Sequence, residues 1–223
     1  MYKTLTVFQE KIALVAGSTG LVGSALALKL DKHTDYSKVI LLSRSGKAFI
    51  NGKTENKVID YDDLERSLSD INPDHVFCTL GTTISKAGSQ KAFRYVDHDL
   101  VLALGKWALK KKVSYFGVVT SMGANAGSSF FYNKVKGEIE TSLSNLDLRR
   151  LGIFRPSLLL GKRKVSRFGE NVGKLIFSLS SFLFIGPLEN YKGISSDRVA
   201  DAMIKDSFNT KEGKRIISNK EML

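Results

Sequence analysis

The sequence predicts an α/β fold with a doubly wound parallel sheet, because three of its features agree. Short runs rich in β-branched and aromatic residues alternate with longer amphipathic runs along the 223 residues. This is the order expected of a parallel sheet that helices cover on both faces. A glycine-rich turn joins the first of these pairs. The composition, 43% hydrophobic and 25% charged, is that of a globular protein, and it excludes a disordered or collagen-like chain.

The short apolar runs predict buried strands, and the amphipathic runs between them predict helices. The expected strands are Lys11–Ala16, Val39–Ser43, Lys57–Asp60, His75–Thr79, Tyr115–Thr120 and Leu151–Phe154. The expected helices are Leu21–Leu30, Gln90–Lys111, Tyr132–Leu143, Asn171–Ser180 and Ser196–Phe208. No linker or repeat interrupts this alternation. We therefore expect residues 1–223 to form a single domain, whose small substrate-side region lies mainly within 155–195.

The charge of the chain favours anionic partners. The formal net charge is +12, and residues 111–223 contribute most of it, with 19 basic and 10 acidic residues. Two basic clusters, Lys110–Lys112 and Lys162–Arg167, are not interleaved with aromatic side chains as they are in nucleic-acid-binding modules. We therefore expect no nucleic-acid partner. An anionic small-molecule substrate and a simply solvated surface both stay open for the second cluster.

Other features of composition concern membranes, metals and compartment. The longest apolar run, Leu175–Leu188, is interrupted by serines, a glycine and a proline, and it is shorter than the roughly 20 residues of a membrane span. A pocket wall and a docking surface are the two alternatives for it. Cys78 is the single cysteine, and the three histidines have no metal-ligand spacing, so we expect no disulfide and no metal. The first residues lack the apolar core of a secretory signal, which favours a cytoplasmic location.

A glycine-rich loop between the first expected strand and the first expected helix is the strongest functional signal. Its residues are Gly17, Ser18, Thr19, Gly20, Leu21, Val22 and Gly23. In such a loop the first glycine permits the tight turn, the second lets the backbone approach a pyrophosphate, and the third lets the helix pack on the strand. The helix N-terminus offers N–H groups and partial positive charge to the phosphates. The loop predicts a dinucleotide cofactor, with a plain turn as the alternative.

The end of the second expected strand indicates which dinucleotide is bound. The strand ends at Ser43, followed by Arg44, and no carboxylate is present there to hold the ribose 2′-hydroxyl of NAD. The guanidinium of Arg44 suits the 2′-phosphate of NADP, and Lys47 is a weaker candidate for the same role. NADP(H) is therefore favoured over NAD(H).

Two further segments follow strands at the same edge of the expected sheet. Asp60 and Tyr61 come after the third strand, where adenine is expected, although Asp60 is also a typical turn residue. Leu80, Gly81 and Thr82 come after the fourth strand, where Gly81 would let the backbone pass close to the cofactor, with a loop-closing glycine as the equal alternative.

Three side chains are candidates for catalysis. Tyr132 and Lys136 are four residues apart at the start of an expected helix, so both project from one face. A phenol has an ordinary pKa of about 10, and a nearby ammonium group lowers it. Tyr132 and Lys136 are also candidates for cofactor binding, since Lys136 can hydrogen-bond the nicotinamide ribose. Ser121 would polarise a carbonyl oxygen while Tyr132 exchanges a proton with that oxygen. Thr120, also a candidate for cofactor binding, competes with Ser121 for the hydroxyl role, whereas the spacing of Lys134 turns it to another face.

Together these segments resemble the short-chain dehydrogenases/reductases, and within that group they are similar to the small atypical members related to the Tat-interacting protein. The matching segments are GSTGLVG at 17–23, SRS at 43–45, LGTT at 80–83, KAG at 86–88, VDHD at 96–99, TSMGA at 120–124, FFYNKVKGEIE at 130–140 and FRPSLLLG at 154–161. The resemblance implies a Rossmann fold, NADP(H) binding and the three catalytic residues above. It also implies that Arg155, Pro156 and Ser157 lie beside the nicotinamide end.

One departure from the family concerns Asp97. Many members carry an asparagine at the comparable place to organise a proton-relay water, and the aspartate argues against a relay of that kind. We expect an NADPH-dependent oxidoreductase that transfers hydride to or from a carbonyl or alcohol substrate. The alternative is an NADP(H)-binding regulatory or redox-sensing protein with little turnover. Small atypical members are often monomers, so a monomer is slightly favoured over a homodimer.

Overall fold

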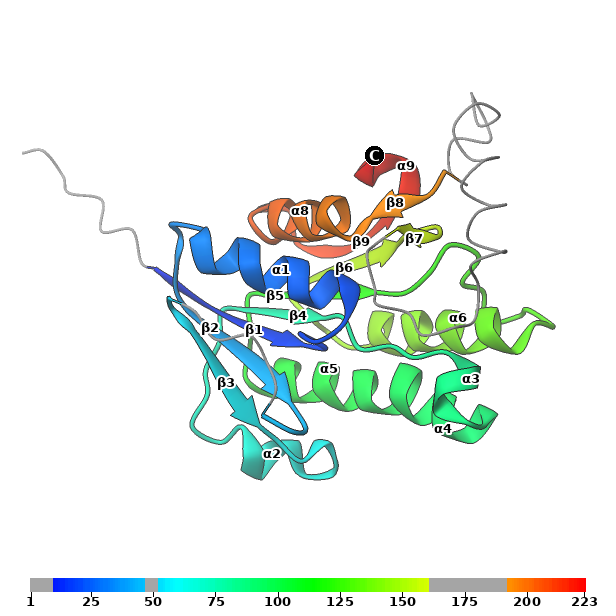
Figure 1. Cartoon of the computed structure of the whole chain (residues 1–223), viewed down its shortest axis with the longest axis horizontal. Coiled ribbons are helices and arrows are strands. Elements are labelled where there is room, and N and C mark those ends of the chain that lie inside the picture. Colours follow the sequence, from blue (N-terminus) through cyan, green and yellow to red (C-terminus); the bar gives the residue numbers. More distant parts are fainter. Residues whose placement is uncertain (1–9, 47–51, 161–191) are drawn as a thin grey trace, which may run out of the picture.

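A seven-stranded parallel sheet forms the centre of the molecule (Figure 1). The structure is a computed structural model, and it describes residues 10–46, 52–160 and 192–223. The strand order is β3-β2-β1-β4-β5-β6-β9, and all neighbouring strands are parallel. The strands are β1 (Lys11–Ala16), β2 (Tyr36–Ser43), β3 (Thr54–Val58), β4 (His75–Cys78), β5 (Tyr115–Val119), β6 (Arg150–Arg155) and β9 (Gly213–Ser218). The predicted doubly wound α/β fold is confirmed.

Helices cover both faces of this sheet, as Figure 1 shows. On one face lie α1 (Leu21–Lys32) and α8 (Ser196–Ser207), and on the other lie α2 (Leu64–Ser67), α5 (Leu100–Lys110) and α6 (Phe131–Ser144). The remaining elements are a 3-10 helix (Tyr61–Asp63), α3 (Ile84–Ala87), α4 (Gln90–Arg94), a π-helical turn (Tyr95–Asp99), α9 (Asn219–Met222), and the two short parallel strands β7 (Leu159–Leu160) and β8 (Ile194–Ser195).

Two buried cores explain why the central strands are apolar without interruption. Successive side chains of a strand point to opposite faces. In β1, Leu14 packs into the core under α5 and α6, and Val15 packs into the core under α1 and α8. Both faces of the strand are therefore buried, which removes the alternation with polar residues that a half-exposed strand would show.

The structure differs from the sequence-based elements mainly at the sheet edges and in one helix. The third strand is β3 at Thr54–Val58, not Lys57–Asp60, and β9 was not predicted at all. Both are edge strands with polar side chains, so they lack the apolar run that marks the central strands. The expected helix Gln90–Lys111 is divided by the π-helical turn. The expected helix Asn171–Ser180 lies outside the described residues.

Candidate active site

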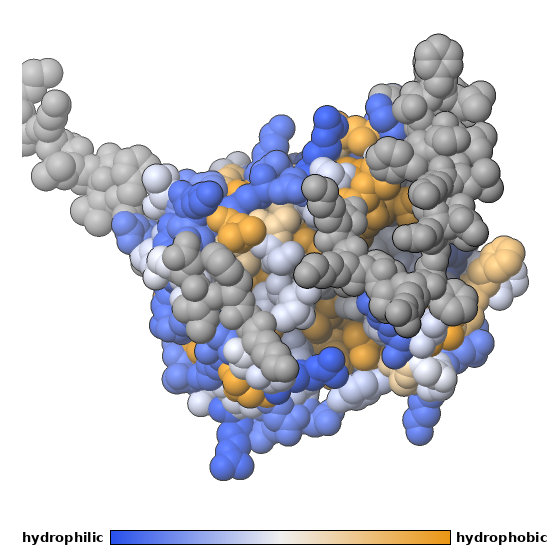
Figure 2. Space-filling view, in the orientation of Figure 1, coloured by the Kyte–Doolittle hydropathy of each residue, from blue (hydrophilic) through white to orange (hydrophobic). Residues whose placement is uncertain are grey.

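A cleft of about 390 Å³ runs along the carboxyl ends of β1, β4, β5 and β6. The order of the strands reverses between β1 and β4, and in open parallel sheets ligands bind in the crevice at such a point. Figure 2 shows apolar and intermediate side chains in the centre of the face drawn, with hydrophilic side chains around them. The cleft is lined by Gly20–Val22, Thr79–Thr83, Val119–Ser121, Pro156–Leu159, Lys86, Asp97, Tyr132 and Lys136.

The glycine loop is held so tightly against β4 that two of its glycines admit no side chain. Gly17 has a φ of +85°, and a Cβ atom there would lie 2.6 Å from the Thr79 carbonyl carbon. A Cβ atom on Gly23 would lie 2.2 Å from the Gly17 oxygen. Gly20 caps α1, with no side-chain cap and no acidic residue in the first turn. The first N–H groups of α1 therefore have no side-chain cap where Gly20–Val22 line the cleft, and such N–H groups are the ones that bind phosphates at other helix N-termini.

The structure places the predicted loop residues in two groups. Gly20, Leu21 and Val22 line the cleft. Gly17, Ser18 and Thr19 form the turn before α1, Gly23 lies in the first turn of α1, and none of these four lines the cleft. Among these, the Ser18 hydroxyl is buried and has no hydrogen-bond partner among the described residues.

The three predicted catalytic side chains all line this cleft. Tyr132 and Lys136 come from α6, and Ser121 follows β5. The Tyr132 ring packs against Phe93, with ring centroids 5.5 Å apart, and the residue is 37% exposed. The Ser121 Oγ atom is buried with no hydrogen-bond partner in the described part of the chain. The fold therefore gathers a free hydroxyl, a phenol and an ammonium group at one place.

The structure also decides between the catalytic candidates and their two alternatives, Thr120 and Lys134. The Thr120 hydroxyl donates to Glu140 Oε1 at 2.6 Å, so it is already engaged, whereas the Ser121 hydroxyl is free. Lys134 does not line the cleft. Ser121 is thus better placed for catalysis than Thr120, and Lys136 is better placed than Lys134.

Asp97 holds the Lys136 ammonium in the wall of the cleft. Lys136 Nζ lies 2.8 Å from Asp97 Oδ1, and the two side chains are 6% and 0% exposed. Asp97 Oδ2 also accepts a hydrogen bond from the Thr82 amide at 2.8 Å. A Cβ atom on Gly81 would stand 3.4 Å from Asp97 Oδ1, so the loop after β4 lies directly on this ion pair. Each charge is buried and compensated by the other.

The residues after β2 and β3 lie beyond the cleft lining. Arg44 is exposed, and no carboxylate pairs with it among the described residues. The Ser43 hydroxyl accepts from the Gly46 amide at 3.1 Å and shapes the turn that carries Arg44. Asp60 accepts from the Asp62 amide at 2.9 Å, which is the turn-forming alternative. Burial raises the pKa of the Tyr61 phenol, and the nearby positive charge of Arg44 acts in the opposite direction.

Arg155 is placed differently from Pro156 and Ser157. Pro156 and Ser157 line the cleft, whereas the Arg155 guanidinium bonds the Glu140 carboxylate. Glu140 was not predicted as a site residue, and neither were the lining residues Thr79, Thr83, Lys86, Val119, Leu158 and Leu159. Glu140 lies one helical turn after Lys136, and this spacing could have identified it as facing the sheet.

Some predictions concern residues or groups outside the cleft. Lys47, Lys162–Arg167 and Leu175–Leu188 lie outside the described residues. Burial raises the pKa of the Cys78 thiol to about 12, so this cysteine is not a nucleophile. In the described part of the chain, no helix has the length and apolar character to cross a membrane. No cluster of three or more metal-ligating side chains occurs there either.

Comparisons with known proteins agree with the fold and with the resemblance. The model of the NAD dependent epimerase/dehydratase family matches residues 13–220. Protein HTATIP2 of Rattus norvegicus is 35% identical over 173 residues, which are 76% of this chain and 71% of that protein. The crystal structure of WbmH of Bordetella bronchiseptica in complex with NAD+ has a TM-score of 0.71 at 16% identity, covering 94% of this chain and 76% of that one.

The expected cytoplasmic location was wrong. Protein FMP52 of Eremothecium gossypii, named as mitochondrial, is 30% identical over 214 residues, or 95% of each chain. Relatives of the same name in other yeasts are also named as mitochondrial. The expectation came from a comparison with secretory signals alone, and such a comparison does not separate the cytoplasm from the mitochondrion.

Proposed function

This chain belongs to the NAD-dependent epimerase/dehydratase family, and we propose that it is an NADP(H)-dependent oxidoreductase that transfers hydride to or from a carbonyl or alcohol substrate. The convergence of Ser121, Tyr132 and Lys136 on the cleft beside the glycine loop carries this proposal. The tight loop and the uncapped start of α1 support a nicotinamide dinucleotide as the cofactor.

The proposed chemistry follows from the hydroxyl, phenol and ammonium groups of the cleft. A bound nicotinamide supplies or accepts the hydride. The Ser121 hydroxyl, which has no partner within the described residues, donates to the carbonyl oxygen of the substrate. Tyr132 gives a proton to that oxygen during reduction and removes it during oxidation. Lys136, fixed by Asp97, keeps positive charge beside the reacting groups.

Substitution of Tyr132 tests the proposed function. We expect Tyr132→Phe to lower NADPH-dependent reduction of 9,10-phenanthrenequinone, a reactive dicarbonyl probe, by about 100-fold or more, because the proton donor is lost. The Kd for NADPH should stay within a factor of about three. Tyr95→Phe is the control, since Tyr95 is 39% exposed but outside the cleft lining. A wild-type protein that binds NADPH tightly yet reduces no carbonyl probe would support the regulatory alternative.

The preference for NADP(H) rests on Arg44. Its guanidinium is exposed, follows β2 and lacks a carboxylate partner among the described residues, so it is free to meet a 2′-phosphate. The structurally similar WbmH was solved with NAD+, so the fold itself does not exclude NAD and the preference depends on residues such as Arg44. A hydrogen bond to a charged group contributes about 1.5–3 kcal/mol, which is roughly a factor of 10 to 100 in affinity.

Fluorescence titration with NADPH and NADH measures this preference. Wild type should bind NADPH more tightly, and Arg44→Ala should weaken NADPH binding about tenfold or more while leaving NADH binding unchanged. Arg66→Ala removes an exposed arginine from α2 and serves as the matched control. Equal affinities of wild type for both cofactors would refute the role of Arg44, but they would not argue against the dinucleotide site itself.

A further inference from the structure

We propose that Glu140 is a positioning residue, which fixes α6 against the ends of β5 and β6 and thereby sets the spacing between Ser121 and the Tyr132–Lys136 pair. The inference rests on the proposed function, because it concerns the geometry of the same three side chains. Glu140 does not line the cleft, so it acts through the residues that it holds.

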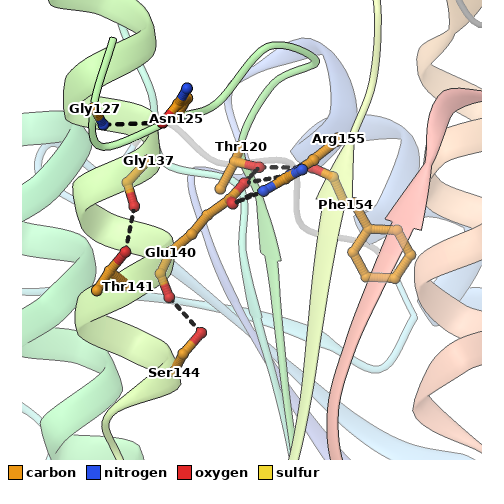
Figure 3. A network of polar contacts seen from close by, with 9 residues as sticks. All are labelled: Thr120, Asn125, Gly127, Gly137, Glu140, Thr141, Ser144, Phe154 and Arg155. Atoms are coloured by element: carbon orange, nitrogen blue, oxygen red, sulfur yellow. Dashed lines mark hydrogen bonds and ion pairs between the residues drawn. The ribbon is translucent and has the colours of Figure 1, made fainter.

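Helical spacing puts Glu140 in line with the two catalytic candidates of α6. Tyr132, Lys136 and Glu140 succeed one another at intervals of four, so they share one face of the helix. The first two reach the cleft. The third lies one turn deeper, and its side chain is only 7% exposed. Figure 3 shows it extending from α6 toward Thr120 and Arg155.

A single carboxylate joins the two strand ends. Glu140 Oε1 accepts from Thr120 Oγ1 at 2.6 Å and from Arg155 Nε at 3.0 Å. Glu140 Oε2 accepts from Arg155 Nε at 3.1 Å and from Arg155 Nη2. Thr120 directly precedes Ser121, and Arg155 directly precedes Pro156, which also lines the cleft. The carboxylate of Glu140 thus contacts Thr120, which lines the cleft beside Ser121, and Arg155, which precedes Pro156. It does so from the helix that carries Tyr132 and Lys136.

The chemistry of the contact makes it directional as well as strong. A forked guanidinium–carboxylate pair constrains orientation in addition to distance. The hydrogen bond to Glu140 raises the pKa of Arg155, so the guanidinium stays charged. Because Glu140 is buried, an altered helix position would leave a carboxylate without its partners. The described geometry is therefore favoured over small displacements of α6.

Close packing of the following loop reinforces the same alignment. A Cβ atom on Gly137 would lie 2.1 Å from the Ala126 amide nitrogen, so the loop after Ser121 rests directly on α6. The Asn125 amide donates to the Asn133 carbonyl at 3.0 Å. The side chain of Asn125 accepts from the Gly127 amide at 2.9 Å, as Figure 3 shows. Both ends of the Ser121 segment are thus attached to α6.

The same helix provides a matched control. Glu138 pairs with Arg94 of α4, but these side chains are 25% and 42% exposed, and neither residue lines the cleft. Glu140→Gln and Glu138→Gln each remove one carboxylate charge from α6 while keeping its volume. Only the first change weakens the connection to β5 and β6.

The test compares these two variants by turnover and by amide exchange. With NADPH and 9,10-phenanthrenequinone, Glu140→Gln should lower kcat about tenfold or more, with KM and the Kd for NADPH within a factor of about three. The Thr120 and Met122 amides, which donate to Phe154 and Pro156 across the strand ends, should exchange hydrogen faster. Glu138→Gln should change none of these quantities. An unchanged kcat in Glu140→Gln would overturn the proposal.

A second pair of variants separates positioning from stability. Arg155→Met leaves the buried Glu140 carboxylate unpaired and should lower Tm, whereas the double variant Glu140→Leu/Arg155→Met removes both charges and should recover it. Under the proposal kcat stays low in the double variant, and recovery of kcat together with Tm would overturn it.

If wild type binds NADPH but reduces nothing, the proposed function fails. Faster exchange at Thr120 and Met122 in Glu140→Gln alone then still supports the positioning role, and equal exchange refutes it.

Discussion

The two ends of the parallel sheet differ in their buried side chains, because unpartnered hydroxyl groups occur at the carboxyl end beside its bonded ones. At the carboxyl end, the hydroxyls of Ser18 and Ser121 are buried without a partner among the described residues. At the amino end, β2, β4, β5 and β6 begin with Tyr36, His75, Tyr115 and Arg150, and all four side chains are hydrogen-bonded. The unpartnered Ser121 hydroxyl lines the cleft, where a ligand can reach it, and the hydrogen-bonded groups at the amino end stabilise the fold.

The network at the amino end joins the sheet to α8. Tyr36 OH forms hydrogen bonds with His75 Nδ1 at 2.7 Å and with Ser207 Oγ at 3.1 Å. Arg150 donates through Nε to the Ser114 carbonyl at 2.8 Å and through Nη1 to the Ser207 carbonyl at 2.9 Å. Burial is the main cause that lowers the pKa of His75 to about 3, so this imidazole is neutral near pH 7.

Removal of Arg150 should have the largest effect on stability. Arg150→Met leaves the Ser114, Ser207 and Asn209 carbonyls without this donor, so we expect the free energy of unfolding to fall by about 3 kcal/mol. Urea denaturation measures this change, and the Kd for NADPH should be unaltered. Arg149→Met is the control, because the neighbouring Arg149–Glu212 pair is 67% and 64% exposed and contributes at most about 1 kcal/mol. Equal losses in both variants would contradict a special role for this end.

Acid should weaken the amino end through His75. The folded protein holds this imidazole at a pKa of about 3, against 6.5 as its ordinary value, so the unfolded chain binds more protons between these limits. The free energy of unfolding therefore falls as pH decreases from 6.5 toward 3, by up to about 1.4 kcal/mol per pH unit. Carboxylates titrate in the same range, so the informative quantity is the difference between wild type and His75→Phe. Identical pH slopes would show that His75 is not the group responsible.

The smallest change in stability is expected at the cleft. Ser121→Ala removes a buried hydroxyl that has no partner in the described structure, so the free energy of unfolding should stay constant or rise by up to about 1 kcal/mol. Reduction of the dicarbonyl probe should nevertheless fall. Ser207→Ala is the matched serine at the other end, where the hydroxyl donates to the Ile204 carbonyl at 2.7 Å, and it should lower stability by about 1 kcal/mol. Comparable decreases in the free energy of unfolding in Ser121→Ala and Ser207→Ala would contradict this difference between the two ends of the sheet.

The central strands and the local spacing of site residues could be predicted from the sequence, whereas the edge strands and the long-range contacts could not. Central strands such as β1 are buried on both faces and leave continuous apolar runs, so they were predicted, whereas the polar edge strand β9 was not. Tyr132 and Lys136 share one helix, so local spacing was enough to bring them together. Glu140 meets Thr120 and Arg155 only after two strands and a helix have packed. Spacing shows which face Glu140 is on, but not what it contacts.

The π-helical turn at Tyr95–Asp99 makes one part of the cleft depend on chain length. Such a turn holds one residue more than an α-helical turn, so it is related to a regular helix by insertion of a single codon. Loss of one residue just before Asp97 would rotate its side chain by about 100° relative to α4. The carboxylate would then no longer point at Lys136. Among descendants of this gene, an in-frame deletion of three nucleotides could therefore remove the ion pair while both of its residues remain encoded.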